Sequence, residues 1–217
     1  MEEEIEFLLT HASRYLIKDP APHDVLSMFA GLRPLAATGN DLNSAAISRD
    51  HVLHISRSGL VTITGGKWTT YRRMAEDTVD QAALLAQLEH SPSVTHELPI
   101  HGYHKNADMF GDLEVYGSDA PAIQDIIRDT PENQLPLHPE LPTLTGEVVW
   151  AVRNEMARTV EDFLSRRTRS LLLNARASIE MAPKVAELMA EELKRDSAWK
   201  QDQVKKYEEL ANGYFVK

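Results

Sequence analysis

Apolar side chains recur at the spacing of an α-helix in several stretches of this chain, which predicts amphipathic helices there. Beyond Thr145 this spacing dominates, so the last third of the chain is expected to be a small helical bundle. Pro183 is expected in the first turn of its helix, because proline fits a helix interior poorly. The predicted helices cover residues 2–16, 70–88, 148–166, 178–195 and 196–212.

A second pattern, short segments rich in β-branched residues, predicts strands. Val52–Ile55 and Leu60–Thr64 are joined by the loop Ser56–Gly59, so we expect a β-hairpin with Arg57 at its solvated tip. Residues 25–32 also have the composition of a strand, and we expect this strand to be mostly buried.

Together these elements predict an α+β chain: an antiparallel hairpin and a long helix, followed by an all-α C-terminal domain. Seven of the eleven prolines lie between Ser91 and Thr145, around one short predicted helix at Pro121–Arg128. We expect a linker near His90–Glu97. The predicted domains are residues 1–92 and 93–217.

The turn between the second strand and the long helix carries the strongest functional signal. Gly65 and Gly66 allow a sharp turn and a close approach by another group. Thr69 or Thr70 can cap the helix, whose N-terminus offers unpaired N–H groups and a partial positive charge. With Lys67 beside it, the turn suits a phosphate, a carboxylate or an electron-rich ring edge.

Of two other interpretations of this turn, one is excluded and one stays open. A P-loop is excluded, because its first glycine would stand at Val61 and its Ser or Thr at Trp68. A turn in which the two glycines serve only backbone geometry stays open.

Composition limits the classes of function. The 217 residues carry a net charge of −10, which argues against a nucleic-acid partner without excluding a local basic pocket. With no cysteine there is no disulfide, thiol nucleophile or cysteine metal site. No apolar run is long enough to span a bilayer, and the acidic, amphipathic start is unlike a signal peptide.

Two clusters that invite a ligand assignment are better explained otherwise. His101, His104 and Asp108 match no metal-ligand spacing, so we assign no metal site. The basic run Arg166–Arg169 follows Glu161-Asp162, which favours ion pairing between helices or domains over nucleic-acid binding.

Four blocks of sequence, in order, resemble the FAD-dependent glycerol-3-phosphate dehydrogenases, the respiratory flavoenzymes of the aerobic type. The blocks are AGLRPL at Ala30–Leu35, SRDH at Ser48–His51, SGLVTITGGKWTTYRRMAEDTVD at Ser58–Asp80 and EVVWAVRNEMARTVEDFLSRRTR at Glu147–Arg169. The resemblance implies oxidation of sn-glycerol 3-phosphate to dihydroxyacetone phosphate, with electrons passing through FAD to a membrane quinone.

The resemblance also implies site residues. Arg33, Arg49 and Lys67 match the substrate-binding positions of the family, and no histidine matches a catalytic base. The turn would place backbone N–H groups at the flavin edge that gains negative charge on reduction. The implied cofactor-binding residues are Gly65, Gly66, Lys67, Trp68 and Thr69.

No G-x-G-x-x-G motif with an acidic partner is present, so the part that grips the dinucleotide is expected elsewhere. We therefore expect this chain to be the C-terminal portion of the enzyme, with Met1 as a truncation point. We expect the chain alone to be inactive and not to retain FAD. The full-length enzyme is expected to lie peripherally on the inner face of the cytoplasmic membrane, and a homodimer is compatible with the resemblance. Two alternatives remain: a glycerol-3-phosphate oxidase-type relative, and a helical interaction module without catalytic activity.

Overall fold

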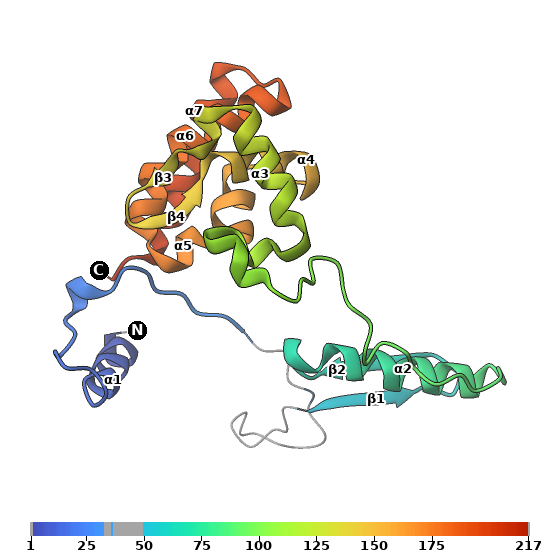
Figure 1. Ribbon diagram of the computed structural model, residues 1–217. Helices are drawn as coiled ribbons and strands as arrows, with labels where there is room; N and C mark the ends of the chain where they lie inside the picture. The colour runs from blue at the N-terminus through green and yellow to red at the C-terminus, as the bar shows by residue number, and fades with distance from the viewer. Residues whose placement is uncertain (1, 33–35, 37–49, 217) are drawn as a thin grey trace. The chain divides into compact units, whose positions relative to one another are not determined.

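The computed structural model describes residues 2–32, 36 and 50–216, with helices and two small antiparallel hairpins (Figure 1). The predicted α+β class is confirmed. The chain divides into two compact units: Gly31–Ile100 forms the hairpin unit, and Met1–Ala30 with His101–Lys217 forms the helical unit. The predicted boundary after residue 92 stays a prediction. Within the described residues, no helix is both long and apolar enough to cross a membrane.

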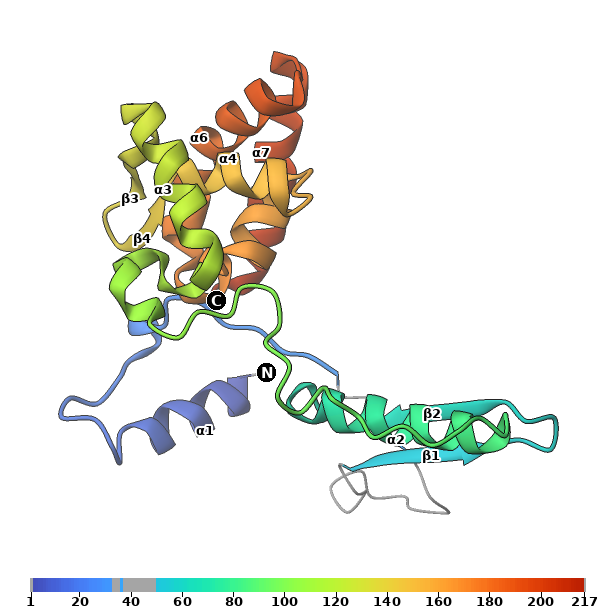
Figure 2. The ribbon, with the colours of Figure 1, turned by 45° about the vertical axis from the view of Figure 1, so that its right-hand side comes forward.

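The hairpin unit contains the predicted hairpin and helix. Strands β1 (His51–Ile55) and β2 (Val61–Gly65) pair antiparallel, with His51 opposite Gly65. Helix α2 (Tyr71–Leu85) lies along the hairpin and contacts β2 (Figures 1 and 2). Neither strand contains a fully buried residue, and no residue of α2 is buried.

The core of the helical unit lies among four helices: α4 (Thr145–Asn154), α5 (Ser170–Leu173), α6 (Ala175–Leu193) and α7 (Ser197–Ala211). Helices α6 and α7 pack against each other (Figure 2). Each begins with a side-chain cap: Asn174 accepts a hydrogen bond from the Ala177 N–H, and Asp196 accepts one from the Trp199 N–H. The largest fully buried side chains include Phe163, Leu164, Leu171, Met181, Met189 and Tyr207.

A smaller cluster precedes this core. The 3₁₀ segment Ala107–Asp119 leads into α3 (Ala120–Asp129), which confirms the short helix predicted there. Strands β3 (Pro136–His138) and β4 (Leu141–Leu144) form a second hairpin that the sequence analysis missed. Each strand has only a few residues and contains proline, so neither shows a recognisable alternation. The helical unit is therefore not all-α.

The helix predicted over 148–166 is wrong in its middle. Helix α4 ends at Asn154, and Met156 takes a left-handed φ of 57° and is 74% exposed. A new helical segment then starts under its own cap: the Asp162 carboxylate accepts from the Thr159 N–H, and the Thr159 Oγ1 accepts from the Asp162 N–H, both at 3.0 Å. This reciprocal cap is a start signal inside the apolar pattern. The segment continues as a π-helix, Asp162–Arg167.

The expected place of Pro183 is also wrong. Helix α6 begins at Ala175, so Pro183 lies in its interior rather than its first turn. A proline there removes one backbone hydrogen bond and costs about 3 kcal/mol. Burial of Met181, Val185 and Met189 on the same helix offsets that cost.

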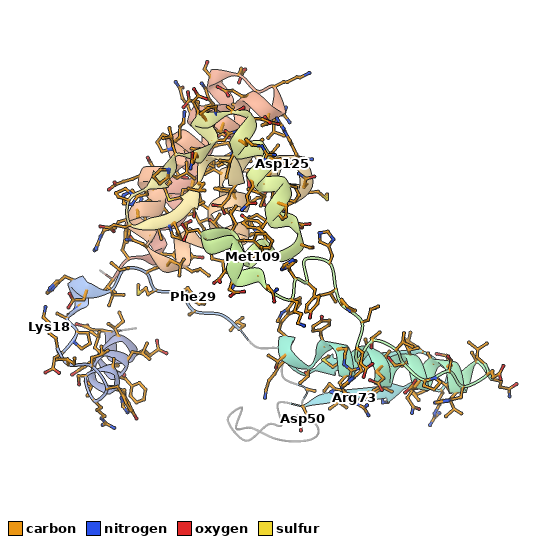
Figure 3. All side chains as sticks on the ribbon, viewed as in Figure 1. Lys18, Phe29, Asp50, Arg73, Met109 and Asp125 are labelled. Carbon is orange, nitrogen blue, oxygen red and sulfur yellow. The ribbon has the colours of Figure 1, made fainter. Side chains whose placement is uncertain are left out.

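The strand predicted over 25–32 is absent. This segment has neither helix nor strand, and Phe29 is 68% exposed (Figure 3). A strand needs a neighbouring strand, but here the Met28 N–H donates to the Tyr214 carbonyl and the Leu26 carbonyl accepts from the Ala175 N–H. The preceding helix α1 (Glu2–Ala12) confirms the predicted helix over a shorter length.

Candidate functional site

The turn after β2 is built on two glycines that geometry requires. Gly65 and Gly66 have φ of 77° and 76°, in the left-handed region that favours glycine. A Cβ on Gly65 would lie 2.8 Å from the Asp50 carbonyl oxygen. A Cβ on Gly66 would collide with the Sδ of Met74 and lie 3.0 Å from its Cε. The two glycines therefore let β2 turn tightly against both β1 and α2.

Thr70 fixes the backbone of Lys67. Its Oγ1 accepts from the Lys67 N–H and donates to the Lys67 carbonyl, both at 3.0 Å, and the Thr70 N–H donates to the same carbonyl at 2.9 Å. The predicted cap is thus corrected: Thr70 stands at the N-cap of α2, but its side chain bonds back to Lys67 instead of to the helix. Lys67 is held in extended backbone at the start of a 3₁₀ turn.

Two of the sequence blocks meet at this turn, and the residue that follows a third lies beside it. The Cβ of Ala36, the residue after AGLRPL, lies 3.5 Å from the position of a Cβ on Gly65. Asp50 and His51, the end of SRDH, lie beside the two glycines through the pairing of β1 with β2. Asp50, His51 and the two glycines, which belong to two of the blocks, are therefore neighbours in space.

His51 also ties the hairpin to the helix. Its Nε2 lies 2.9 Å from the Oδ2 of Asp77, and the Nε of Arg73, on α2 (Figure 3), lies 3.0 Å from the other oxygen. The imidazole and carboxylate are both partly buried. Sequence reasoning missed His51, Asp77 and Thr70 as positioning residues. Only Thr70, three residues after Lys67, had a recognisable spacing.

The outer surface of the turn is open. Lys67, Trp68 and Thr69 are exposed, and the indole of Trp68 stacks on Tyr71 with ring centroids 5.3 Å apart. The N–H groups of Trp68 and Thr69 occupy the first two positions of the turn, where no earlier carbonyl of the turn can accept them. These donors and the Lys67 ammonium can meet an anion or an electron-rich ring edge. The five predicted cofactor-binding residues thus form one continuous surface.

The predicted substrate-binding set is only partly described. Lys67 lies in the turn, while Arg33 and Arg49 lie outside the described residues. The substrate role of all three, and the cofactor role of Gly65–Thr69, stay predictions. Because geometry alone already requires both glycines, the purely structural interpretation of Gly65-Gly66 stays open as well.

The other two clusters singled out in the sequence have ordinary surroundings. The Nε2 of His101 lies 2.7 Å from the Oδ2 of Asp119, and across the described ranges no three His, Asp or Glu side chains gather as a metal site would require. The basic run forms ion pairs, but the predicted pairing between elements is confirmed only for Arg167, which lies 3.8 Å from Glu155 at the end of α4. Arg166 instead pairs within its own helical segment, with Glu161 and Asp162.

Comparisons with known proteins identify similar sequences and a matching family model. The family model for the C-terminal domain of alpha-glycerophosphate oxidase matches residues 61–202. The mitochondrial glycerol-3-phosphate dehydrogenase of Rattus norvegicus is 37% identical over 94% of this chain, which covers 31% of that protein. The mitochondrial enzyme of Arabidopsis thaliana is 34% identical over 96% of this chain and 38% of its own length.

A solved structure shows the same similarity. The glycerol-3-phosphate dehydrogenase of Bacillus halodurans complexed with FAD aligns with a TM-score of 0.71 and 25% identity, over 99% of this chain and 45% of that one. The chain spans about a third of the length of the curated relatives that it matches.

Proposed function

The chain belongs to the family of the C-terminal domain of alpha-glycerophosphate oxidase, and on this premise we propose that it is the carboxy-terminal portion of a FAD-dependent glycerol-3-phosphate dehydrogenase. The observation that carries the proposal is the meeting of Ala36, Asp50 and Gly65 at one turn. Arg33 and Arg49 stand three residues and one residue away from these positions along the chain. The proposed substrate is sn-glycerol 3-phosphate, and the proposed product is dihydroxyacetone phosphate.

Lys67 and the two arginines would bind the phosphate and orient the substrate. A phosphate dianion needs several fixed donors; guanidinium groups can meet it with two hydrogen bonds, and an ammonium meets it as a point charge. The hydrogen bonds from Thr70 hold the Lys67 backbone, so the ammonium projects from a fixed start. Fixing the donors in advance reduces the entropic cost of orienting the substrate.

The open face of the turn fits one edge of a flavin. The N–H groups of Trp68 and Thr69 and the N-terminus of α2 would stabilise negative charge at that edge. FAD, when bound, supplies the chemistry by accepting hydride from C2 of the substrate. The remainder of the FAD site is expected outside this chain, so the chain alone is proposed to be inactive.

The electron acceptor separates two versions of this proposal. A quinone acceptor, as the resemblance implies, would place the enzyme peripherally at the membrane. The family model, by contrast, takes its name from an oxidase, for which oxygen is the acceptor. The full-length enzyme with sn-glycerol 3-phosphate should reduce a soluble quinone analogue without forming peroxide; stoichiometric peroxide would favour the oxidase.

The substrate site is tested by Lys67→Met in the full-length enzyme, with Arg57→Met as control. Arg57 is an exposed cation of the same unit at the other end of the hairpin. Loss of one charge-assisted contact to phosphate costs about 2–3 kcal/mol, or roughly 30- to 160-fold in kcat/KM. The flavin should stay bound, because backbone groups face it. Equal kinetics of the two variants would overturn the role of Lys67.

A further inference from the structure

A hollow lies wholly within the helical unit, far along the chain from the glycine turn. It has a volume of about 460 Å³ and is lined from three sides: the 3₁₀ segment, strand β4 with α4, and the residues that follow the π-helix. We call it the arginine hollow. Its charged and polar lining includes Asp112, Tyr116, Glu147, Glu155, Arg167 and Arg169.

The backbone around the hollow is unusual. The π-helix Asp162–Arg167 ends at it, and Arg169 takes a left-handed φ of 58°. π-helical turns are rare and often occur at functional sites. A non-glycine residue in the left-handed region costs of the order of 1 kcal/mol, which glycine would avoid. A guanidinium therefore occupies a position that backbone geometry alone would give to glycine.

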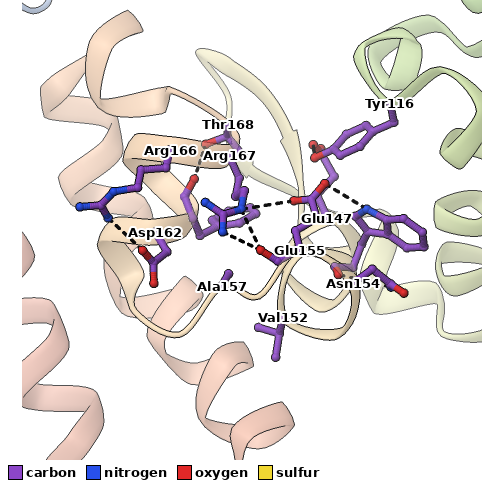
Figure 4. Close-up of polar contacts among 12 residues, drawn as sticks. Tyr116, Glu147, Val152, Asn154, Glu155, Ala157, Asp162, Arg166, Arg167 and Thr168 are labelled. Atoms are coloured by element: carbon purple, nitrogen blue, oxygen red, sulfur yellow. Dashed lines mark hydrogen bonds and ion pairs between the residues drawn. The ribbon is translucent and has the colours of Figure 1, made fainter. Parts of the chain in front are cut away.

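Of Arg167 and Arg169 in the hollow, Arg169 keeps its charge available, whereas Arg167 lies 3.8 Å from the Glu155 carboxylate. Arg167 donates Nε and Nη2 to the Glu155 carbonyl, a neutral acceptor, at 3.1 and 2.6 Å (Figure 4). Arg166, which also lines the hollow, pairs instead with Asp162. Arg169 is exposed, and its side chain forms no ion pair with any residue in the described ranges.

The acidic groups of the hollow are Asp112, Glu147 and Glu155, and hydrogen bonds from other donors hold the last two. Glu147 is 6% exposed; its Oε1 accepts from the Leu144 N–H, and its Oε2 accepts from the Tyr116 hydroxyl, both at 2.7 Å. Glu155 accepts from the Trp150 indole with Oε1. Its Oε2 is buried and finds no hydrogen-bond donor in the part of the chain that the structure describes.

Burial raises the pKa of both carboxyls, while the hydrogen bonds from Leu144 and Tyr116 to Glu147, and from Trp150 to Glu155, oppose the shift, as does the charge of Arg167 beside Glu155. The hollow thus presents the guanidinium groups of Arg167 and Arg169 beside the carboxyl groups of Asp112, Glu147 and Glu155.

We propose that the arginine hollow binds a phosphate group, either inorganic phosphate or a phosphomonoester, through the guanidinium groups of Arg167 and Arg169. Paired guanidinium groups match a tetrahedral oxyanion with two hydrogen bonds each. This site shares no residue with the glycine turn, and the proposal does not depend on the proposed enzymatic activity.

The test is calorimetric titration of the full chain with inorganic phosphate, and separately with sn-glycerol 3-phosphate, at low salt. Arg169→Gly removes one guanidinium and relieves the left-handed strain, so the variant should fold at least as stably as wild type while binding about 10- to 100-fold more weakly. Arg169→Lys keeps a charge and should recover part of the affinity. Glu155→Gln supplies an amide donor and should bind at least as tightly as wild type.

Two controls remove charge elsewhere: Lys206→Met on the surface of α7 and Lys67→Met at the glycine turn should bind as wild type does. Tighter binding of glycerol phosphate identifies a phosphomonoester site, and equal or weaker binding identifies a phosphate site. No heat from either ligand, unchanged affinity of Arg169→Gly, or loss of binding only in Lys67→Met would overturn the proposal.

Discussion

The imidazole Nε2 of His51 lies 2.9 Å from the carboxylate Oδ2 of Asp77, and this contact joins strand β1 to helix α2 across 26 residues of chain. His51 ends the SRDH block, while Asp77 lies two turns inside the helix that follows the glycine turn. The pair holds the hairpin, the turn and the helix as one piece.

Asp77→Ala should loosen this piece. The change leaves His51 and Arg73 without their shared acceptor, which should cost about 1–2 kcal/mol of local stability. Amide hydrogen exchange in β1 and the first turns of α2 should accelerate roughly 5- to 30-fold. Asp80→Ala, one turn further along the same helix, is the matched control. Equal acceleration in the two variants would show that the His51 contact contributes nothing.

Gly66→Ala tests how much of the glycine turn is geometry. The left-handed φ and the collision with Met74 should together destabilise the hairpin unit by about 1–3 kcal/mol. The double variant Gly66→Ala/Met74→Ala removes the collision but keeps the strained φ, and so isolates the backbone term. Urea denaturation followed by amide exchange of the hairpin reads out both. A silent Gly66→Ala would contradict the close packing described here.

Glu147 should give the helical unit a pH-dependent stability. Burial raises the pKa of its carboxyl above the ordinary 4.5. At a pH between the unfolded and the folded pKa, the folded protein therefore holds a proton there that the unfolded chain has lost. That contribution is complete below the unfolded pKa and is lost as the pH rises through the folded pKa. Unfolding in urea from about pH 4.5 to 8 should therefore show stability that decreases with pH at this site.

Glu147→Gln should flatten that dependence even if it lowers stability overall. Tyr116→Phe should steepen it: the lost hydroxyl donates to the ionised carboxylate, so its removal raises the pKa of Glu147 further. Identical pH profiles for wild type and Glu147→Gln would mean that the carboxyl titrates alike in both states.

Limited proteolysis should cut the chain between α2 and the 3₁₀ segment. Residues 88–100 have no helix or strand and are exposed, which is how proteases recognise a substrate backbone. The expected product is a stable helical fragment that ends at Lys217. Primary cleavage within α4 or α6 instead would contradict the division into two units.

The purified chain should carry no flavin. This expectation follows from the missing dinucleotide motif and from the single wall of the site that the glycine turn provides. An absorbance spectrum between about 350 and 500 nm checks it, since bound FAD would contribute its own bands there. Stoichiometric flavin would show that the chain holds a complete cofactor site.

How well the sequence predicted the fold depended on what stabilises each element. The β1–β2 hairpin, α2, α6 and α7 follow from local periodicity and were anticipated. The helix over 148–166 failed because the cap between Thr159 and Asp162 overrides a continuous apolar pattern. The strand over 25–32 failed because pairing depends on a neighbour that no local pattern reveals.

At the site, too, local features were predictable from the sequence and long-range contacts were not. Gly65, Gly66 and Lys67 were recognisable because they are contiguous and their chemistry is local. The contact between His51 and Asp77 depends on the register of the hairpin, which composition does not encode. Glu155 and Arg169 lie on neighbouring elements of the helical unit, and only the folded chain brings them to one hollow.

The pairing of His51 with Gly65 also determines where this chain can change length. Residues added to the loop between Ile55 and Val61 lengthen the hairpin tip and leave the pairing at its base intact. One residue added inside either strand would exchange its inward and outward faces and separate the two blocks. Insertions among distant homologues should therefore collect at the tip, and a search with a fixed distance between SRDH and GGK would overlook those with longer hairpins.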